Sequence, residues 1–132
     1  MSGVLDGRTA FVTGGSRGIG KSIVRKLAEA GANVAFTYRT QRNEAVLLQK
    51  DLAAKDHATL ALQMEATDRK SVAKAMSDAV ARFGPFSILV NNAGVNKPTD
   101  FDQITDDDWD QILGVNLKGP FICSQIALPH LR

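Results

Sequence analysis

The chain has 132 residues, of which 44% are hydrophobic and 23% charged, so it suits one globular domain, residues 1–132, with a buried core. Its formal net charge of +2 is small and dispersed, which argues against nucleic acid as a partner. No apolar run reaches the length of a membrane span, and no basic-then-apolar segment opens the chain, so we expect neither a membrane span nor a signal peptide.

Short apolar runs alternate along the chain with longer segments in which apolar residues recur every three or four positions. The runs predict strands, and the longer segments predict helices, in the order 9–13 (strand), 19–28, 34–38 (strand), 41–55, 59–64 (strand), 72–83, 88–90 (strand) and a last helix that begins after Thr105. Strands that are apolar throughout are typical of a parallel sheet covered on both faces. The sequence therefore predicts an α/β fold, a doubly wound parallel (Rossmann) sheet with strand order 3-2-1-4 and helices on both faces.

A glycine-rich stretch, TGGSRGIG at residues 13–20, joins the first predicted strand to the first helix. In this setting Gly14 permits a tight turn, Gly18 lets the backbone approach a diphosphate, and Gly20 lets the helix pack closely on the sheet. Free N–H groups at the start of the helix then face the anion. The alternative is a glycine-rich turn without a ligand.

The end of the second predicted strand indicates which dinucleotide would bind. An NAD site typically has an acidic residue about 20 residues past the glycines, which binds the ribose hydroxyls. Here residues 37–40 read Thr-Tyr-Arg-Thr, without an acid. Arg39, with Arg17 from the glycine stretch, would attract the 2′-phosphate of NADP. The alternative is that both are solvated surface arginines.

Three motifs in order resemble those of the short-chain dehydrogenase/reductase family. They are the glycine stretch, the segment Asn91-Asn92-Ala93-Gly94 after a short apolar strand, and Asn116 within Val-Asn-Leu. The resemblance covers the whole chain. Within the family the sequence looks most like 3-oxoacyl-acyl-carrier-protein reductases and related NADP-linked ketoreductases.

The resemblance implies a cofactor site with particular roles. Glu65 stands where the family usually carries an Asp that contacts adenine, and Asn92 would lie beside the nicotinamide-side ribose. The alternative for Asn91 and Asn92 is a turn whose side chains bond the local backbone. The implied cofactor residues are Gly14, Ser16, Arg17, Gly18, Ile19, Gly20, Arg39, Glu65, Ala66, Asn92, Ala93 and Gly94.

Asn116 is the candidate catalytic residue. Its spacing from Trp109, Ile112 and Leu113 predicts an amide on the apolar, buried face of the last helix, where it needs hydrogen-bond partners. Pro120 cannot donate to the Asn116 carbonyl, which predicts a kink. The resemblance implies that this carbonyl holds a water in a proton relay. The alternative is a helix that merely tolerates Asn and Pro.

The family's proton donor, a Tyr in Tyr-x-x-x-Lys, has no counterpart in these residues. The single tyrosine, Tyr38, is followed four residues later by Arg42, and arginine does not lose its proton. We therefore expect the NADP(H)-binding portion of an oxidoreductase that acts on a ketone or secondary alcohol, with 3-oxoacyl thioesters among the candidate substrates, and no activity from these 132 residues alone. The alternative is a non-catalytic nucleotide-binding or partner-binding module.

Other features complete these expectations. The single cysteine, Cys123, can form neither an internal disulfide nor a metal cage, which favours a reducing compartment such as the cytoplasm. His57 and His130 are far apart in sequence. We interpret Cys123 and the two histidines as structural or exposed residues, and we expect no metal site. The apolar surface of the last helix suits association into a homo-oligomer, as in the family.

Overall fold

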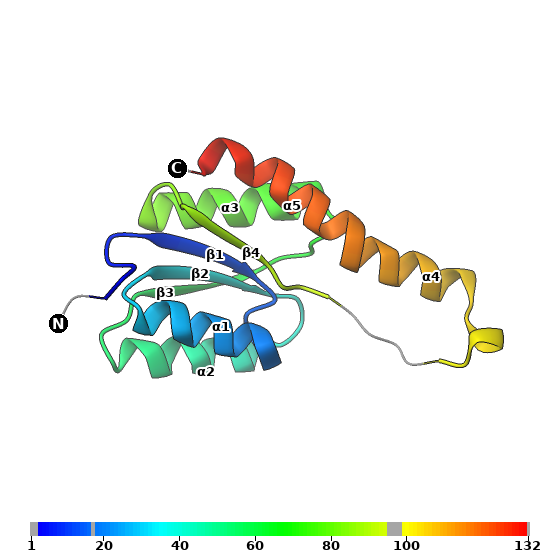
Figure 1. Ribbon diagram of the computed structural model, residues 1–132, viewed down its shortest axis with the longest axis horizontal. Helices are drawn as coiled ribbons and strands as arrows, with labels where there is room; N and C mark the ends of the chain where they lie inside the picture. The colour runs from blue at the N-terminus through cyan, green and yellow to red at the C-terminus, as the bar shows by residue number, and fades with distance from the viewer. Residues whose placement is uncertain (1–2, 17, 95–98, 132) are drawn as a thin grey trace.

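The computed structural model describes residues 3–16, 18–94 and 99–131, and it contains a four-stranded sheet with every strand parallel to its neighbours (Figure 1). The strands are β1 (Thr9–Thr13), β2 (Asn33–Tyr38), β3 (Thr59–Gln63) and β4 (Ile88–Asn91). Their spatial order is β3-β2-β1-β4. The predicted doubly wound sheet and its strand order are confirmed.

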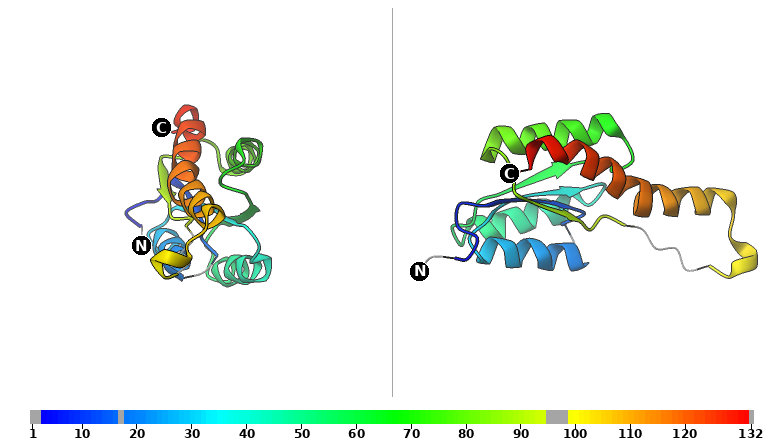
Figure 2. Two further views of the ribbon diagram at one scale, coloured as in Figure 1. Left: turned by 90° about the vertical axis from the view of Figure 1, so that its right-hand side faces the viewer. Right: turned by 45° about the horizontal axis from the view of Figure 1, so that its top comes forward.

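Helices cover both faces of this sheet. Helices α1 (Gly18–Glu29) and α2 (Arg42–Ala53) lie against one face, and α3 (Arg69–Phe83) and α5 (Gly119–Ala127) lie against the other (Figure 2). Side chains on β1 alternate between the two cores, so that Phe11 packs on the α3 side and Val12 on the α1 side, both with no exposed surface. Burial on both faces explains why these strands are apolar without interruption.

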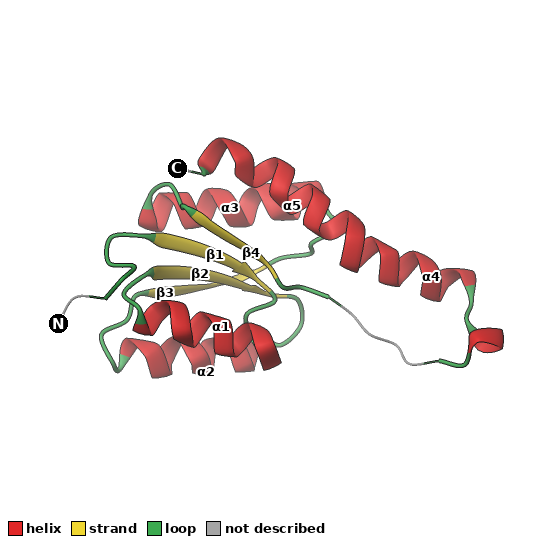
Figure 3. Ribbon diagram, viewed as in Figure 1, coloured by secondary structure: helices red, strands yellow, loops and turns green. Residues whose placement is uncertain are grey.

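The last predicted helix is divided into three segments in the structure. Helix α4 (Asp106–Leu113) is followed by a π turn at Gly114–Lys118 and then by α5, along one continuous helical path (Figure 3). Thr105 caps α4 as predicted, because its hydroxyl accepts a hydrogen bond from the Asp108 N–H and the Asp108 carboxylate accepts one from the Thr105 N–H. In the π turn the Gly119 N–H bonds to the Gly114 carbonyl, five residues back. The predicted irregularity around Asn116 thus takes the form of a π turn.

One expectation about this helix is wrong. The face that carries Asn116 was expected to be buried, but Asn116 is exposed, and Trp109 and Leu117 leave 62% and 66% of their surface open. The reason is that α4 extends beyond the sheet, whereas α5 packs on it through Ile122 and Cys123 (Figure 1). We call the segment Asp106–Leu113 with the π turn the projecting helix.

Within the described ranges, no helix combines the length and apolar character that a membrane crossing requires.

Candidate functional site

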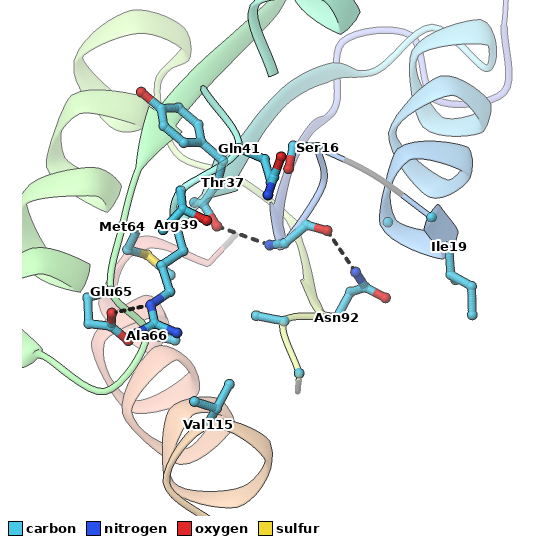
Figure 4. A pocket seen from close by; sticks show the side chains of 17 residues that line it. Ser16, Ile19, Thr37, Arg39, Gln41, Met64, Glu65, Ala66, Asn92 and Val115 are labelled. Carbon is cyan, nitrogen blue, oxygen red and sulfur yellow. Dashed lines mark hydrogen bonds and ion pairs between the residues drawn. The ribbon is translucent and has the colours of Figure 1, made fainter. Parts of the chain in front are cut away.

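A pocket of about 400 Å³ opens at the carboxyl ends of all four strands (Figure 4). Crevices at this edge of a parallel sheet are where such folds bind ligands, because the loops from neighbouring strands converge there. The pocket is lined by Gly14, Ser16, Gly18, Ile19, Gly20, Thr37, Tyr38, Arg39, Thr40, Gln41, Met64, Glu65, Ala66, Asn92, Ala93, Gly94 and Val115. Every predicted cofactor residue is among these except Arg17, which lies outside the described residues.

The glycine stretch turns sharply as it leaves β1. Gly14 adopts a φ of +68°, and a side chain there would bring its Cβ to 2.9 Å from the Cα of Ala93. The Gly14 N–H donates to the Thr37 hydroxyl at 3.1 Å, and the Gly15 N–H donates to the Thr37 carbonyl at 2.9 Å. The turn therefore depends on a glycine at position 14, as predicted, and on Thr37 near the end of β2.

The start of α1 packs directly against this turn. A Cβ at Gly20 would collide with the Gly14 carbonyl oxygen and with the amide nitrogen of Asn92. The same Asn92 amide donates to the Gly14 carbonyl at 2.9 Å, and this hydrogen bond joins the loops that follow β1 and β4 (Figure 4). Gly20 therefore permits the close approach predicted for it, and Asn92 fixes the shape of the turn.

Thr13 anchors the loop after β4, a role that sequence reasoning missed. Its hydroxyl oxygen accepts hydrogen bonds from the N–H groups of Asn92 and Ala93, each at 3.0 Å. The side chain is almost fully buried at the end of β1. A threonine directly before the glycines was the available signal, since a hydroxyl at a strand end can satisfy free N–H groups of the next loop.

Arg39 and Glu65 form an ion pair at the edge of the pocket. Arg39 Nε lies 2.8 Å from Glu65 Oε2, with side-chain exposures of 56% and 33% (Figure 4). The Thr67 hydroxyl donates to Glu65 Oε1 at 3.3 Å. The pair follows from the fold, because β2 and β3 are neighbours in register through Tyr38 and Gln63 and end side by side. The sequence placed both residues in the site but did not predict this contact.

Asn116 lies outside the pocket lining but close to it. A Cβ at Gly94 would be 3.2 Å from Asn116 Oδ1, so the π turn lies against the loop that follows β4. Its neighbour Val115 does line the pocket. Asn91 is directed elsewhere, because its amide donates to the Ser124 hydroxyl at 3.1 Å and ties β4 to α5.

Several lining residues were not predicted. They share one signal, which is that they lie within three residues of the carboxyl end of a strand or, for Val115, precede the candidate catalytic residue. The rule that ligands bind at the carboxyl ends of parallel strands would have found most of them. They are Thr37, Tyr38, Thr40, Gln41, Met64 and Val115.

Cys123 is not part of the site. It is buried between α5 and the sheet, and desolvation raises the pKa of its thiol to about 11, which keeps it protonated and unreactive near neutral pH. Among the described residues, no group of three or more His, Cys, Asp or Glu side chains is placed to hold a metal ion.

The sheet order and the pocket define a Rossmann-type α/β protein with a nucleotide-type crevice. The sequence profile described as short chain dehydrogenase matches residues 8–132, and the chain belongs to this family.

Relatives in the family include reductases and cofactor complexes. The 3-oxoacyl-[acyl-carrier-protein] reductase FabG of Staphylococcus aureus is 37% identical over 124 residues, which are 94% of this chain and 50% of the relative. A short chain dehydrogenase from Burkholderia cenocepacia in complex with NADP has a TM-score of 0.92 at 39% identity, covering 96% of this chain and 52% of its own. A blue fluorescent protein from a metagenomic library in complex with NADPH has a TM-score of 0.89 at 40% identity, with coverages of 96% and 52%. The chain spans about half the length of these relatives.

Proposed function

We propose that the chain is the NADP(H)-binding portion of an oxidoreductase that transfers a hydride between NADP(H) and a ketone or secondary alcohol. The observation that carries this proposal is the combination of a glycine cradle at the start of α1 with Arg39 at the end of β2, on one pocket. Two complexes among the similar structures, with NADP and with NADPH, support the same cofactor. The resemblance to FabG supports 3-oxoacyl thioesters as a substrate class.

The residues present fit a dinucleotide phosphate. The positions whose Cβ would fill the cradle, Gly14 and Gly20, are glycines, and Gly18 adjoins open space in which a Cβ would meet no atom within 4 Å. The N-terminal end of α1 opens on the pocket, so its free N–H groups and positive dipole end can bind a diphosphate. Ser16, which lines the same wall, can add a hydroxyl donor.

Arg39 would hold the 2′-phosphate, because a guanidinium forms charge-assisted hydrogen bonds to phosphate oxygens. Asn92 would keep the cradle in shape beside the nicotinamide-side ribose. The nicotinamide supplies the hydride chemistry when the cofactor is bound. Asn116 is the residue of this chain that we assign to proton transfer, through the π turn that lies against Gly94.

A non-catalytic nucleotide-binding module is the second candidate. In residues 1–132 the single tyrosine, Tyr38, lies at the end of β2 and is followed four residues later by Arg42, so the features of these residues belong to nucleotide binding. Both candidates require the nucleotide site. They differ in whether a proton donor is supplied to a substrate carbonyl.

Two further properties belong to the proposal. The exposed apolar side chains of the projecting helix and α5 support self-association, with Trp109, Leu113, Leu117 and Phe121 as the contact residues. The single, buried cysteine suits a reducing compartment, so we place the protein in the cytoplasm.

The proposal is tested by titrating the chain with NADPH and with NADH and following the fluorescence of the reduced cofactor. We expect NADPH to bind at least about ten-fold more tightly, because hydrogen bonds to a charged partner contribute about 1.5–3 kcal/mol. Arg39→Asp should reverse this preference, whereas Arg82→Asp, the same charge change in the last turn of α3, should not. Equal affinity of the unaltered chain for the two cofactors would contradict the assignment of Arg39.

A further inference from the structure

The carboxylate of Glu65 is held in place at the entrance to the pocket. One of its oxygens contacts Arg39 Nε at 2.8 Å, and the other accepts a hydrogen bond from the Thr67 hydroxyl at 3.3 Å. Its backbone N–H donates to the Ser71 hydroxyl at 2.8 Å, which fixes the chain at this point. Glu65 is therefore an acid with a defined position and is not a freely moving surface side chain.

Arg39 is held from two sides at the same place. Its backbone carbonyl accepts a hydrogen bond from the Gln63 amide at 3.4 Å, and its side chain meets Glu65 through Nε. A guanidinium has five N–H donors, so its terminal groups remain available to a second anion while Glu65 uses Nε. A phosphate bound to these terminal groups would contact the same Arg39 guanidinium as the Glu65 carboxylate. The two negative groups would therefore lie close together.

This arrangement has opposite effects on an incoming phosphate. Glu65 orients Arg39, but an ion pair of this exposure contributes little to phosphate binding, because water screens the attraction between the two charges. Against this, Glu65 neutralises the positive charge that attracts the phosphate and repels a group of charge near −2 at short range. Because the repulsion acts on a doubly charged group, we expect it to exceed the gain from orientation.

We propose that Glu65 is a specificity-determining residue that restrains the preference of the site for a 2′-phosphate by acting as the counter-ion of Arg39. The inference rests on the proposed nucleotide site and deepens it. With Glu65 paired to Arg39, the site binds the 2′-phosphorylated cofactor more tightly than the unphosphorylated one. The difference in affinity is smaller than it would be with an unpaired arginine. This preference can be measured with adenosine 2′,5′-bisphosphate and adenosine 5′-monophosphate, which differ only in the 2′-phosphate.

The test is a calorimetric titration of both nucleotides into the unaltered chain, Glu65→Gln and the control Glu29→Gln. Glu29 is exposed at the end of α1, outside the pocket lining, and its substitution makes the same change in net charge. We expect Glu65→Gln to tighten adenosine 2′,5′-bisphosphate by about three- to ten-fold and to leave adenosine 5′-monophosphate within about two-fold. The gain should shrink as salt is raised from about 0.05 M to 0.5 M, because it is electrostatic.

The outcomes separate the inference from the function on which it rests. Unchanged or weaker binding of the bisphosphate by Glu65→Gln, with monophosphate binding intact, overturns the inference alone. Binding of neither nucleotide to the unaltered chain overturns the proposed function. If thermal unfolding shows that Glu65→Gln is not folded, Glu65→Ala removes the same charge. The ratio of its bisphosphate affinity to its monophosphate affinity must then rise by about three- to ten-fold, and an unchanged ratio also overturns the inference.

Discussion

The sheet and the projecting helix differ in what covers their apolar side chains. At the sheet, Phe11, Phe36 and Phe86 have no exposed surface and lie between β-strands and helices. On the projecting helix and the start of α5, Trp109, Leu117 and Phe121 expose more than half of their surface. Helix α3, which packs on the sheet through Val72 and Met76, shows the same helical periodicity in the sequence as the projecting helix. Periodicity therefore identifies an apolar face, but it does not tell what packs against that face.

The two regions differ equally in their loops. The pocket end of the sheet is joined across three strands by hydrogen bonds in which the Thr13 and Thr37 hydroxyls accept and the Asn92 amide donates. The projecting helix instead continues into α5 and lies against the loop that follows β4, where a Cβ at Gly94 would be 3.2 Å from Asn116 Oδ1. The nucleotide pocket is thus built where hydrogen bonds join segments of three strands, which suits a site that must hold its donors in fixed positions.

The largest difference should appear when one phenylalanine from each region is truncated. Phe86→Ala removes a fully buried ring that packs on Phe11 and His130, and we expect the free energy of unfolding to fall by about 3–5 kcal/mol. Phe121→Ala removes a ring that is 56% exposed and lies under the Arg69 guanidinium, and should cost at most about 1 kcal/mol. Urea unfolding followed by circular dichroism measures both. In dilute solution, where copies of the chain do not associate, similar losses for the two variants would show that other parts of the same chain cover Phe121 at the start of α5.

A smaller effect should separate two glycines, both of which lie in helical segments. In Gly20→Ala the new methyl group meets the Gly14 carbonyl and the Asn92 amide, so the cradle must shift, and we expect NADPH affinity to fall at least about ten-fold. In Gly114→Ala the methyl group makes only an ordinary contact with Thr67 at 3.7 Å, so affinity should stay within about two-fold. The fluorescence titration with NADPH measures both variants. Equal losses of NADPH affinity in the two variants would show that cofactor binding depends on Gly20 of the cradle no more than on Gly114 of the projecting helix.

The strands and most helices could be predicted because their signals are local. The apolar runs and the cap at Thr105 mark elements whose positions depend on a few neighbouring residues. Gly14 and Gly20 could be placed for the same reason, since a strand-to-helix turn with this spacing demands them.

What the sequence did not reveal depends on contacts between distant segments. The Arg39–Glu65 pair exists because β2 and β3 end side by side, and the anchor at Thr13 exists because β4 lies next to β1. Likewise the exposure of Asn116 depends on how far α4 extends beyond the sheet, which no periodicity encodes.

The most direct test of the nucleotide site is a backbone amide NMR titration of the ¹⁵N-labelled chain with NADP⁺. The account predicts that shifts concentrate at the carboxyl ends of the four strands, at Gly14, Gly20, Arg39, Ala66 and Gly94, and that Leu117 and Phe121 stay unchanged. Absence of shifts at the strand ends, or shifts centred on the projecting helix, would contradict it.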